Sequence, residues 1–302
     1  MGRALVFAHF DPHAIVDDYV MYSLACYRQF FEIIHFVTTS PLDREQTARV
    51  ASVVDRVIVR SNIGYDFMSW RVGFEALPRH CDFSEVVFAN DSIYGPCSDL
   101  SPFWGRVDQL GVDLWGASLN HQFRPHVQSF FMGFGRRLLA SGFARNFWQG
   151  VEVIPDKMQL IFAYEVGLSA RVEEAGFTIG GVISFPVLDS GLKKRVIADN
   201  ASTIDRKPAA QARAYVQQES ALNPVQLCWG EALRAGLPFV KVELLRDNPL
   251  HANLCTVHAT LKAMRWYDLQ LIARHLERTV RAGTFPPVGQ TNGGLRRVGG
   301  IL

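Results

Sequence analysis

The chain has 302 residues, of which 48% are hydrophobic and 20% are charged, a composition typical of a globular protein. Its formal net charge is +2, from 31 basic and 29 acidic residues, which argues against nucleic-acid binding through bulk electrostatics. The five scattered cysteines include no Cys-x-x-Cys pair, no apolar segment approaches the roughly 20 residues of a membrane span, and no signal peptide is evident, so we expect a location in the reducing cytoplasm.

Short apolar segments alternate with amphipathic helical segments over the first 120 residues. A helical pattern at residues 15–26 follows the first apolar segment. The expected strands are Leu5–Ala8, Ile33–Val37, Arg56–Val59, Val86–Ala89 and Leu114–Ser118, and further helices are expected at Asp43–Val54 and Phe67–Leu77. This alternation predicts an α/β fold with a mainly parallel sheet covered by helices on both faces.

The second half of the chain has a less regular pattern. Gln128–Phe134 is expected to form another strand, and Pro155 opens a helix that ends at Gly176. After Phe185, prolines and glycines predict an irregular segment. A long amphipathic helix is expected over Val257–Arg281, followed by a loose glycine-rich tail.

Polar residues follow four of the expected strands at the point where each strand ends. The four segments are His9-Phe10-Asp11, Thr38-Thr39-Ser40, Ser61–Asp66 and Asn90-Asp91-Ser92. Ligands of open α/β sheets bind outside the carboxyl ends of the strands. The common position of these segments therefore predicts one shared pocket, although loops are polar in proteins of every kind.

Asp91 is the strongest local candidate for a metal-binding residue. It follows the apolar strand Val86–Ala89 within a short turn. Mg²⁺ or Mn²⁺ needs only one or two carboxylates when diphosphate oxygens and water supply its other ligands. The same Asp-Ser pair is also typical of a turn or a helix cap, and the local sequence does not distinguish between the two interpretations.

Two further segments carry candidate binding or catalytic groups. Asn62, Gly64 and Asp66 combine acceptor oxygens for sugar or ribose hydroxyls with a glycine that permits close backbone approach. Their alternative interpretation is a turn that leads into an Asp-capped helix. Glu165 lies beside the apolar stripe of the helix after Pro155, where a carboxylate can act as a general base, although glutamates on helix surfaces are common.

His9, Asp11 and His13 suggest a different class of enzyme. Two histidines around an aspartate after a first strand are similar to the zinc ligands of sugar deacetylases. Those enzymes have two adjacent aspartates, whereas this chain has Phe10-Asp11, and a third zinc ligand is not evident. Glycine-rich phosphate loops and the Gly-x-Ser-x-Gly elbow are missing from the sequence. A zinc-dependent deacetylase or hydrolase therefore stays an alternative.

Several segments in a fixed order carry a resemblance to a known family. They are FAHFDPHAIVDDYVMYSL, NIGYDFMSWRVGF, VVFANDSIYGP, DLWGAS, VQSFFMGF, FWQGV, YEVGLSARVEEAGF and NPVQLCWGEALRAGLPFVKVELLRDNPL. Over about residues 4–250, the chain resembles the rhamnan synthesis F family of bacterial polysaccharide glycosyltransferases. NDSIYGP and PFVKVELLRDNP are the most specific of the matching motifs.

The resemblance implies the A-type glycosyltransferase fold, which is a single α/β domain. The catalytic domain is expected over residues 1–250, with a nucleotide-binding half at about 1–120 and an acceptor half at about 121–250. Residues 251–302 are expected to form a C-terminal extension made of the amphipathic helix and a flexible tail. The basic residues of that helix allow two interpretations, namely contact with anionic lipid near a lipid-linked acceptor, or packing on the domain with a solvated basic face.

The resemblance also implies roles for individual residues. Tyr164-Glu165 resembles the motif that supplies the base of inverting A-type enzymes, with Glu165 as the base. Asp91 corresponds to the acidic residue of the metal-site turn. We expect one divalent cation, Mg²⁺ or Mn²⁺, at Asp91, with His251 as a more distant ligand and with Arg71 or Lys241 assisting the departure of the diphosphate. The residues expected to bind the donor are His9, Asp11, Asn62, Gly64, Tyr65, Asp66, Asn90, Ser92, Gln128, Ser129 and Lys241.

Together these observations predict a glycosyltransferase that acts with inversion. We expect transfer of L-rhamnose from dTDP-L-rhamnose to a cell-surface polysaccharide or lipopolysaccharide acceptor, such as an O-antigen chain. The partners are then a nucleotide-sugar and a glycan or lipid-linked saccharide, without nucleic acid, in the cytoplasm or at the inner face of the cytoplasmic membrane. The zinc hydrolase and a non-catalytic saccharide-binding module are the alternatives.

Overall fold

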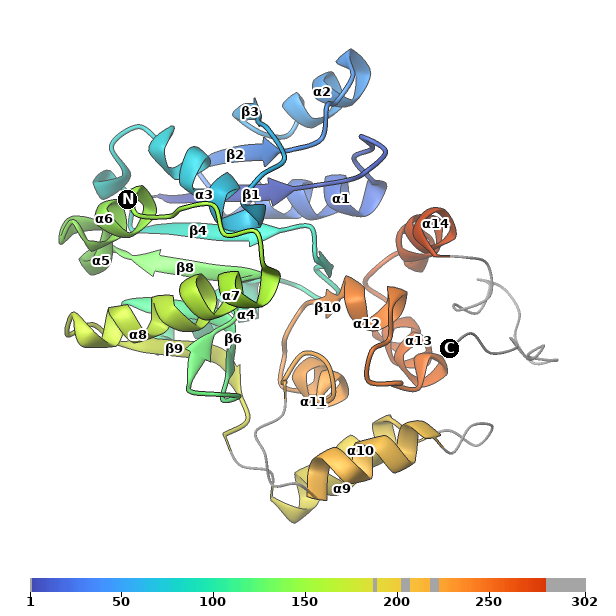
Figure 1. The fold of residues 1–302 in the computed structure, drawn as a ribbon. Coiled ribbons are helices and arrows are strands. Elements are labelled where there is room, and N and C mark those ends of the chain that lie inside the picture. The colour runs from blue at the N-terminus through green and yellow to red at the C-terminus, as the bar shows by residue number, and fades with distance from the viewer. Residues whose placement is uncertain (1, 187–188, 202–206, 218–222, 281–302) are drawn as a thin grey trace.

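A single mixed sheet forms the centre of the protein. The computed structural model describes residues 2–186, 189–201, 207–217 and 223–280. Within these residues, eight strands are joined in the order β3-β2-β1-β4-β8-β6-β7, and β9 pairs with β6 as a branch (Figure 1). The strands are β1 (Arg3–His9), β2 (Ile33–Thr38), β3 (Arg56–Val59), β4 (Glu85–Asn90), β6 (Leu114–Asn120), β7 (His126–Val127), β8 (Phe131–Gly135) and β9 (Ile179–Ser184).

The direction of the strands decides which loops meet. Parallel pairing joins β3, β2, β1 and β4, and β8 lies antiparallel between β4 and β6. Because β8 is antiparallel to both neighbours, β6 runs in the same direction as β4, and β9 pairs with β6 in parallel. The carboxyl ends of β1, β2, β3, β4, β6 and β9 therefore share one edge of the sheet with the amino end of β8. The predicted α/β fold with a mainly parallel sheet is confirmed.

Helices cover both faces of the sheet (Figure 1), which suits the nearly continuous apolar runs within strands such as β1 and β4. The helical elements are α1 (Asp18–Tyr27), α2 (Arg44–Ala51), α3 (Tyr65–Glu75), a 3₁₀ turn (His80–Asp82), α4 (Ser101–Leu110), α5 (Arg136–Ala140), α6 (Phe143–Gln149), α7 (Lys157–Leu160), a π-helical segment (Ile161–Val166), α8 (Gly167–Glu174), α9 (Ser190–Asp199), α10 (Lys207–Gln217), α11 (Trp229–Arg234), α12 (Val242–Arg246), α13 (Leu254–Met264) and α14 (Leu269–Thr279). Leu5 and Phe7 of β1 belong to the core that includes α1 and α4, whereas Val6 and Ala8 belong to the core that includes α3.

Two parts of the chain differ from the expectations. The segment after Phe185, expected to be irregular, contains the helices α9 and α10, and Asp189 caps the first of them. The expected single helix Val257–Arg281 is two helices, α13 and α14. They are separated because Arg265 adopts a left-handed conformation with φ 52° and Asp268 caps the second helix. The glycine-rich tail, from residue 281 onwards, lies outside the described residues.

The helix α14 packs against the α/β domain. Ile272 and Leu276 are buried in the core that also includes α1. Arg274 Nη1 lies 3.1 Å from an oxygen of Asp18 in α1, and Arg278 also binds acidic side chains near the start of that helix. These contacts support the second interpretation of the basic helix, in which it packs on the domain.

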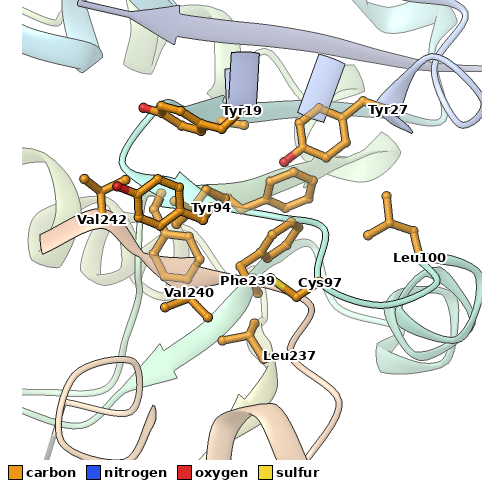
Figure 2. Packing of buried hydrophobic residues seen from close by; sticks show 14 of the residues in the cluster. Tyr19, Tyr27, Tyr94, Cys97, Leu100, Leu237, Phe239, Val240 and Val242 are labelled. Atoms are coloured by element: carbon orange, nitrogen blue, oxygen red, sulfur yellow. The ribbon is translucent and has the colours of Figure 1, made fainter. Parts of the chain in front are cut away.

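A small second sheet joins the turn after β4 to a distant part of the chain. β5 (Ile93–Tyr94) pairs antiparallel with β10 (Val240–Lys241). Figure 2 shows the side chains around this pairing in one apolar cluster with Tyr19 of α1. Gly95 allows the close approach, since its φ is 140° and a Cβ atom there would lie 2.6 Å from a backbone carbonyl oxygen next to β10. The pairing fixes Lys241 beside the acidic turn.

Candidate active site

The acidic turn after β4 is connected to the first turn of α3. Asn90 Nδ2 donates a hydrogen bond to Asp66 Oδ2 at 2.8 Å, and Ser92 Oγ donates to Asn90 Oδ1 at 2.5 Å. The backbone amide of Phe10, in the loop after β1, donates to Asp91 Oδ2 at 2.8 Å. Three strand-end segments thus meet at one point, because β1 and β4 are parallel neighbours and α3 follows β3 along the same edge.

Asp66 and Asp91 form a pair of half-buried carboxyl groups with perturbed protonation. Burial raises the pKa of Asp91 to about 8, and the charge of Asp66 adds to this effect. Burial also raises the pKa of Asp66, although the hydrogen bond from Asn90 and the charge of Lys241 oppose the change. Two carboxyl groups that resist ionisation together are stabilised by any cation that binds between them.

Lys241 interacts with the acidic turn and with the charge of Glu165. Its Nζ donates a hydrogen bond to Ser92 Oγ at 2.9 Å and lies 4.8 Å from the centroid of the Phe130 ring. Burial lowers the pKa of Lys241, while the charges of Glu165, Glu243 and Asp66 act in the opposite direction. An ammonium group held in this position offers positive charge to an anionic ligand at the sheet edge.

Glu165 lies on the π-helical segment between α7 and α8. Its Oε2 accepts hydrogen bonds from the backbone amide of Ser129, at 2.8 Å, and from the Ser129 hydroxyl. His126 Nε2 lies 3.9 Å from Oε1. The His126 Nδ1 atom is 2.8 Å from the carbonyl of Arg124, which can only accept, so Nδ1 carries the proton. Ser129 thus holds the Glu165 carboxylate through Oε2, and Oε1 is available to a ligand.

A divalent cation fits the acidic pair in chemical type. Phe10 and Asn90 bond to the Oδ2 atoms of Asp91 and Asp66, which leaves the Oδ1 atoms as hard oxygen ligands. Within the described part of the chain, no group of three or more His, Cys, Asp or Glu side chains is arranged to hold a metal by itself. A cation here would therefore take its remaining ligands from a diphosphate and water, which is common for Mg²⁺.

The three residues of the zinc alternative do not converge. His9 is buried, its Nδ1 lies 2.9 Å from the Thr38 hydroxyl, and burial lowers its pKa to about 4. Asp11 accepts hydrogen bonds from two backbone amides through Oδ1 and from Arg278 through Oδ2 at 2.5 Å. Burial alone would raise the pKa of Asp11, but these bonds outweigh burial and lower it. His13 is exposed. The structure therefore removes the geometric support for a zinc site.

The other residues expected at the donor site have varied surroundings. Asn62 is exposed, and Gly64 caps α3 in the left-handed region at φ 73°. Tyr65 is 46% exposed, and its hydroxyl donates to the Pro155 carbonyl at 3.2 Å. Gln128 is buried and accepts a hydrogen bond from the Ser118 hydroxyl at 2.6 Å. These contacts tie Tyr65 and Gln128 to neighbouring segments, whereas Asp66 alone of the 62–66 motif joins the acidic turn.

Two accessory residues lie elsewhere. Arg71 binds Glu75 at 3.0 Å and the Val151 carbonyl at 2.8 Å, so its guanidinium is engaged on α3 and its neighbour. His251 is exposed, in a left-handed turn with φ 51°, and it belongs to no group of metal-ligating side chains. The expectations that Arg71 assists the diphosphate and that His251 binds the cation are therefore not supported, whereas Lys241 is hydrogen-bonded to Ser92 of the acidic turn.

Comparison with known proteins identifies the family. A family model described as rhamnan synthesis protein F matches residues 34–283. The chain belongs to the rhamnan synthesis protein F family. Virulence protein VirA of Vibrio anguillarum is 27% identical to it over 206 residues, which are 65% of this chain and 64% of that protein. The uncharacterized protein y4gN of Sinorhizobium fredii is 27% identical over 139 residues, 44% of this chain and 36% of that protein. The chain spans less than two thirds of both relatives.

Solved structures with a similar arrangement are distant from this family member. S. aureus TarS 1–349 has 11% sequence identity and a TM-score of 0.37, with 92% of this chain and 90% of that chain covered. The 4-diphosphocytidyl-2C-methyl-D-erythritol synthase of Anaerococcus prevotii has 9% identity and a TM-score of 0.38, with 72% and 98% covered. Neither similarity is close enough to transfer the role of any residue.

Three side chains that support the site had no clear signal in the sequence. The Tyr19 hydroxyl donates to the Asp91 carbonyl at 2.7 Å, and His126 faces Glu165. Arg278 of α14 reaches the loop after β1 from the opposite end of the chain. The basic pattern of its helix was visible, but nothing local indicated an acidic partner.

Among the described residues, the structure contains no helix with the length and apolarity needed to span a membrane.

Proposed function

We propose that this member of the rhamnan synthesis protein F family is a glycosyltransferase that uses a nucleotide-sugar. The observation that carries the proposal is that Lys241, bonded to Ser92 of the acidic turn, interacts electrostatically with two kinds of carboxyl group, Asp66 of the perturbed pair and the anchored Glu165. The pair suits a cation-bound diphosphate, and Glu165 suits a proton acceptor. Both requirements of sugar transfer thus meet at one edge of the sheet.

The donor and the acceptor are the finer part of the proposal. The family description names rhamnan synthesis, which supports L-rhamnose as the sugar. We propose dTDP-L-rhamnose as the donor and a cell-surface polysaccharide or lipopolysaccharide chain as the acceptor. Residues 1–120 would form most of the donor side, residues 121–250 most of the acceptor side, and residues 251–302 an extension. We place the reaction in the cytoplasm or at the inner face of the cytoplasmic membrane, where nucleotide-sugars and lipid-linked saccharides meet.

The leaving group departs from the donor side of the site. A divalent cation, when bound by Asp66 and Asp91, would supply Lewis-acid stabilisation of the diphosphate. The ammonium group of Lys241, oriented by Ser92, adds a second positive charge toward the same oxygens. The partly buried position of these groups strengthens their electrostatic effect, since fewer water molecules screen it.

Glu165 acts on the acceptor. The two hydrogen bonds from Ser129 hold Oε2, so Oε1 receives the proton of the acceptor hydroxyl. The hydroxyl oxygen then forms a bond to the anomeric carbon while the bond from that carbon to the diphosphate breaks. Because attack and departure occur on opposite faces of an oxocarbenium-like centre, the product has inverted configuration.

Substitution of Glu165 by Gln tests this function. Purified protein would be incubated with dTDP-L-rhamnose, or with UDP- and GDP-sugars, and with rhamno-oligosaccharide acceptors, and nucleoside diphosphate release would be measured. Glu165→Gln should lower turnover by about 10²–10⁴ with little change in the donor KM, because it removes the base and keeps the fold. Glu174→Gln, an exposed change on α8, is the matched control.

The outcomes separate the alternatives. Near wild-type turnover in Glu165→Gln contradicts the assigned base. Failure of the wild-type protein to transfer or hydrolyse any nucleotide-sugar contradicts the proposed function, and saccharide binding without turnover then indicates a binding module. Deacetylation that depends on zinc would favour the hydrolase.

A further inference from the structure

Two exposed phenylalanine rings form a pair, and one of them lies three residues before the candidate base in the sequence. Phe123 is 72% exposed and Phe162 is 46% exposed, and their ring centroids lie 5.0 Å apart with planes at 67°. Among the described residues, Phe123 is the most exposed of the large apolar side chains. Burial of a phenylalanine side chain stabilises a folded protein by about 1.5–3 kcal/mol. Because both rings remain exposed, the folded chain alone gains little of this free energy from the pair.

Phe123 and Phe162 lie on the two segments that lead to His126 and Glu165. Phe123 lies in the loop between β6 and β7, at the sheet edge where the acidic turn lies. Its φ of 67° is unfavourable for a residue with a side chain, so the surrounding loop must hold it there. Phe162 precedes Glu165 by three residues on the π-helical segment. His126 begins β7 directly after the loop and lies 3.9 Å from Glu165 Oε1.

The groups around the pair fit a sugar ring. A pyranose presents C–H groups on a face, which pack on aromatic rings, and hydroxyls at its edge, which need hydrogen bonds. Next to Phe123, His121 Nε2 lies 2.8 Å from the Ser184 hydroxyl, and Arg124 binds Glu173 at 2.9 Å. Two rings among polar and charged side chains make an apolar patch that is small for insertion into a lipid surface.

We propose that Phe123 and Phe162 form a stacking subsite for a sugar ring of the acceptor saccharide. The inference rests on the proposed function, because it takes Glu165 as the residue that receives the proton of the acceptor. A sugar on the rings places a hydroxyl of the same or the next residue toward Oε1 of Glu165. The subsite then contributes to acceptor affinity and leaves donor binding unaffected.

A double variant tests the subsite. With dTDP-L-rhamnose as donor and a soluble rhamno-oligosaccharide as acceptor, Phe123→Ala with Phe162→Ala should raise the acceptor KM by at least about tenfold, equivalent to about 1.4 kcal/mol. The donor KM and the rate of donor hydrolysis without acceptor should not change. Phe162→Tyr should retain the wild-type KM, whereas Phe162→Leu should not, since it keeps the apolar character and loses the flat face. Trp266→Ala, at a position 54% exposed, is the control.

Binding measured without turnover separates this inference from the proposed function. Ligand-observed NMR should detect the same oligosaccharide on the wild-type protein and not on the double variant. If the double variant keeps both the acceptor KM and the NMR signal, the subsite is refuted. A loss seen only with lipid-linked acceptors in vesicles, and not with the soluble one, assigns the rings to lipid and also refutes it. Ring-dependent binding by a protein that turns over no nucleotide-sugar supports the subsite and contradicts the glycosyltransferase.

Discussion

Replacement of Asp91 by Asn should stabilise the folded protein and abolish its response to a cation-bound diphosphate. A carboxyl group whose pKa is higher in the folded protein than in the unfolded chain destabilises the fold above the unfolded pKa. For Asp91 these values are about 8 and 3.8. The cost is therefore absent below about pH 4, increases as the pH rises to about 8, and is constant above that.

The structure sets the size of the effect. A difference of about 4 between the two pKa values corresponds to about 6 kcal/mol at ~1.36 kcal/mol per pKa unit, which is the upper limit. Asp91 is only half-buried and shares its environment with Asp66, so the gain in the free energy of unfolding on removal of its charge is expected to be smaller than this limit. The amide oxygen of Asn keeps the hydrogen bond from the Phe10 amide. We expect a net gain of about 1–3 kcal/mol at pH 8 and much less at pH 5.

Urea unfolding at pH 5, 6.5 and 8 without divalent cations measures this gain. Asp82→Asn, at an exposed position on the opposite edge of the sheet, is the control and should show no gain that grows with pH. Adding Mg²⁺ with dTDP at about 100 times the Kd should stabilise the wild-type protein by about 2.7 kcal/mol and leave Asp91→Asn unchanged. A variant that is no more stable than wild type at pH 8 refutes the burial argument. Equal stabilisation of both proteins by the ligand refutes the role of Asp91 in cation binding.

Other predictions follow from the contacts around the site. Lys241→Met should raise the donor KM at least about tenfold, with partial recovery in Lys241→Arg, and unchanged donor kinetics would exclude a contact with the diphosphate. Arg278→Leu leaves the carboxylates of Asp11 and Asp17 without their partner and should lower the free energy of unfolding by about 1–3 kcal/mol in urea, with Arg278→Lys intermediate; equal stability of all three proteins would contradict this. Because Arg274 and Arg278 are engaged by acidic side chains, the full chain should not float with phosphatidylglycerol vesicles, and flotation would instead support membrane contact.

The sequence by itself determined β1 to β4, β6 and α1 to α3, although not β5 or α4, and it determined the position of polar residues where strands end. Apolar runs such as Leu5–Ala8 and Val86–Ala89 are local signals, since a strand buried on both faces needs apolar side chains throughout. Asp66 and Asp91 were both expected near one edge because parallel strands share their carboxyl ends. The break between α13 and α14 was missed, since the amphipathic pattern continues across it while the backbone at Arg265 does not.

Only the tertiary structure decided which of these residues meet. The antiparallel direction of β8 brings Ser129 to the edge where Glu165 lies, and the β5–β10 pairing brings Lys241 to Ser92 across 149 residues. Arg278 reaches Asp11 across 267 residues through the packing of α14. Such contacts depend on which apolar surfaces pack together. The entropic cost of closing a loop increases only slowly with its length, so at these separations it does not favour one contact partner over another. The local sequence indicates that a carboxylate lies at a strand end, but the tertiary structure determines which charged side chain contacts it.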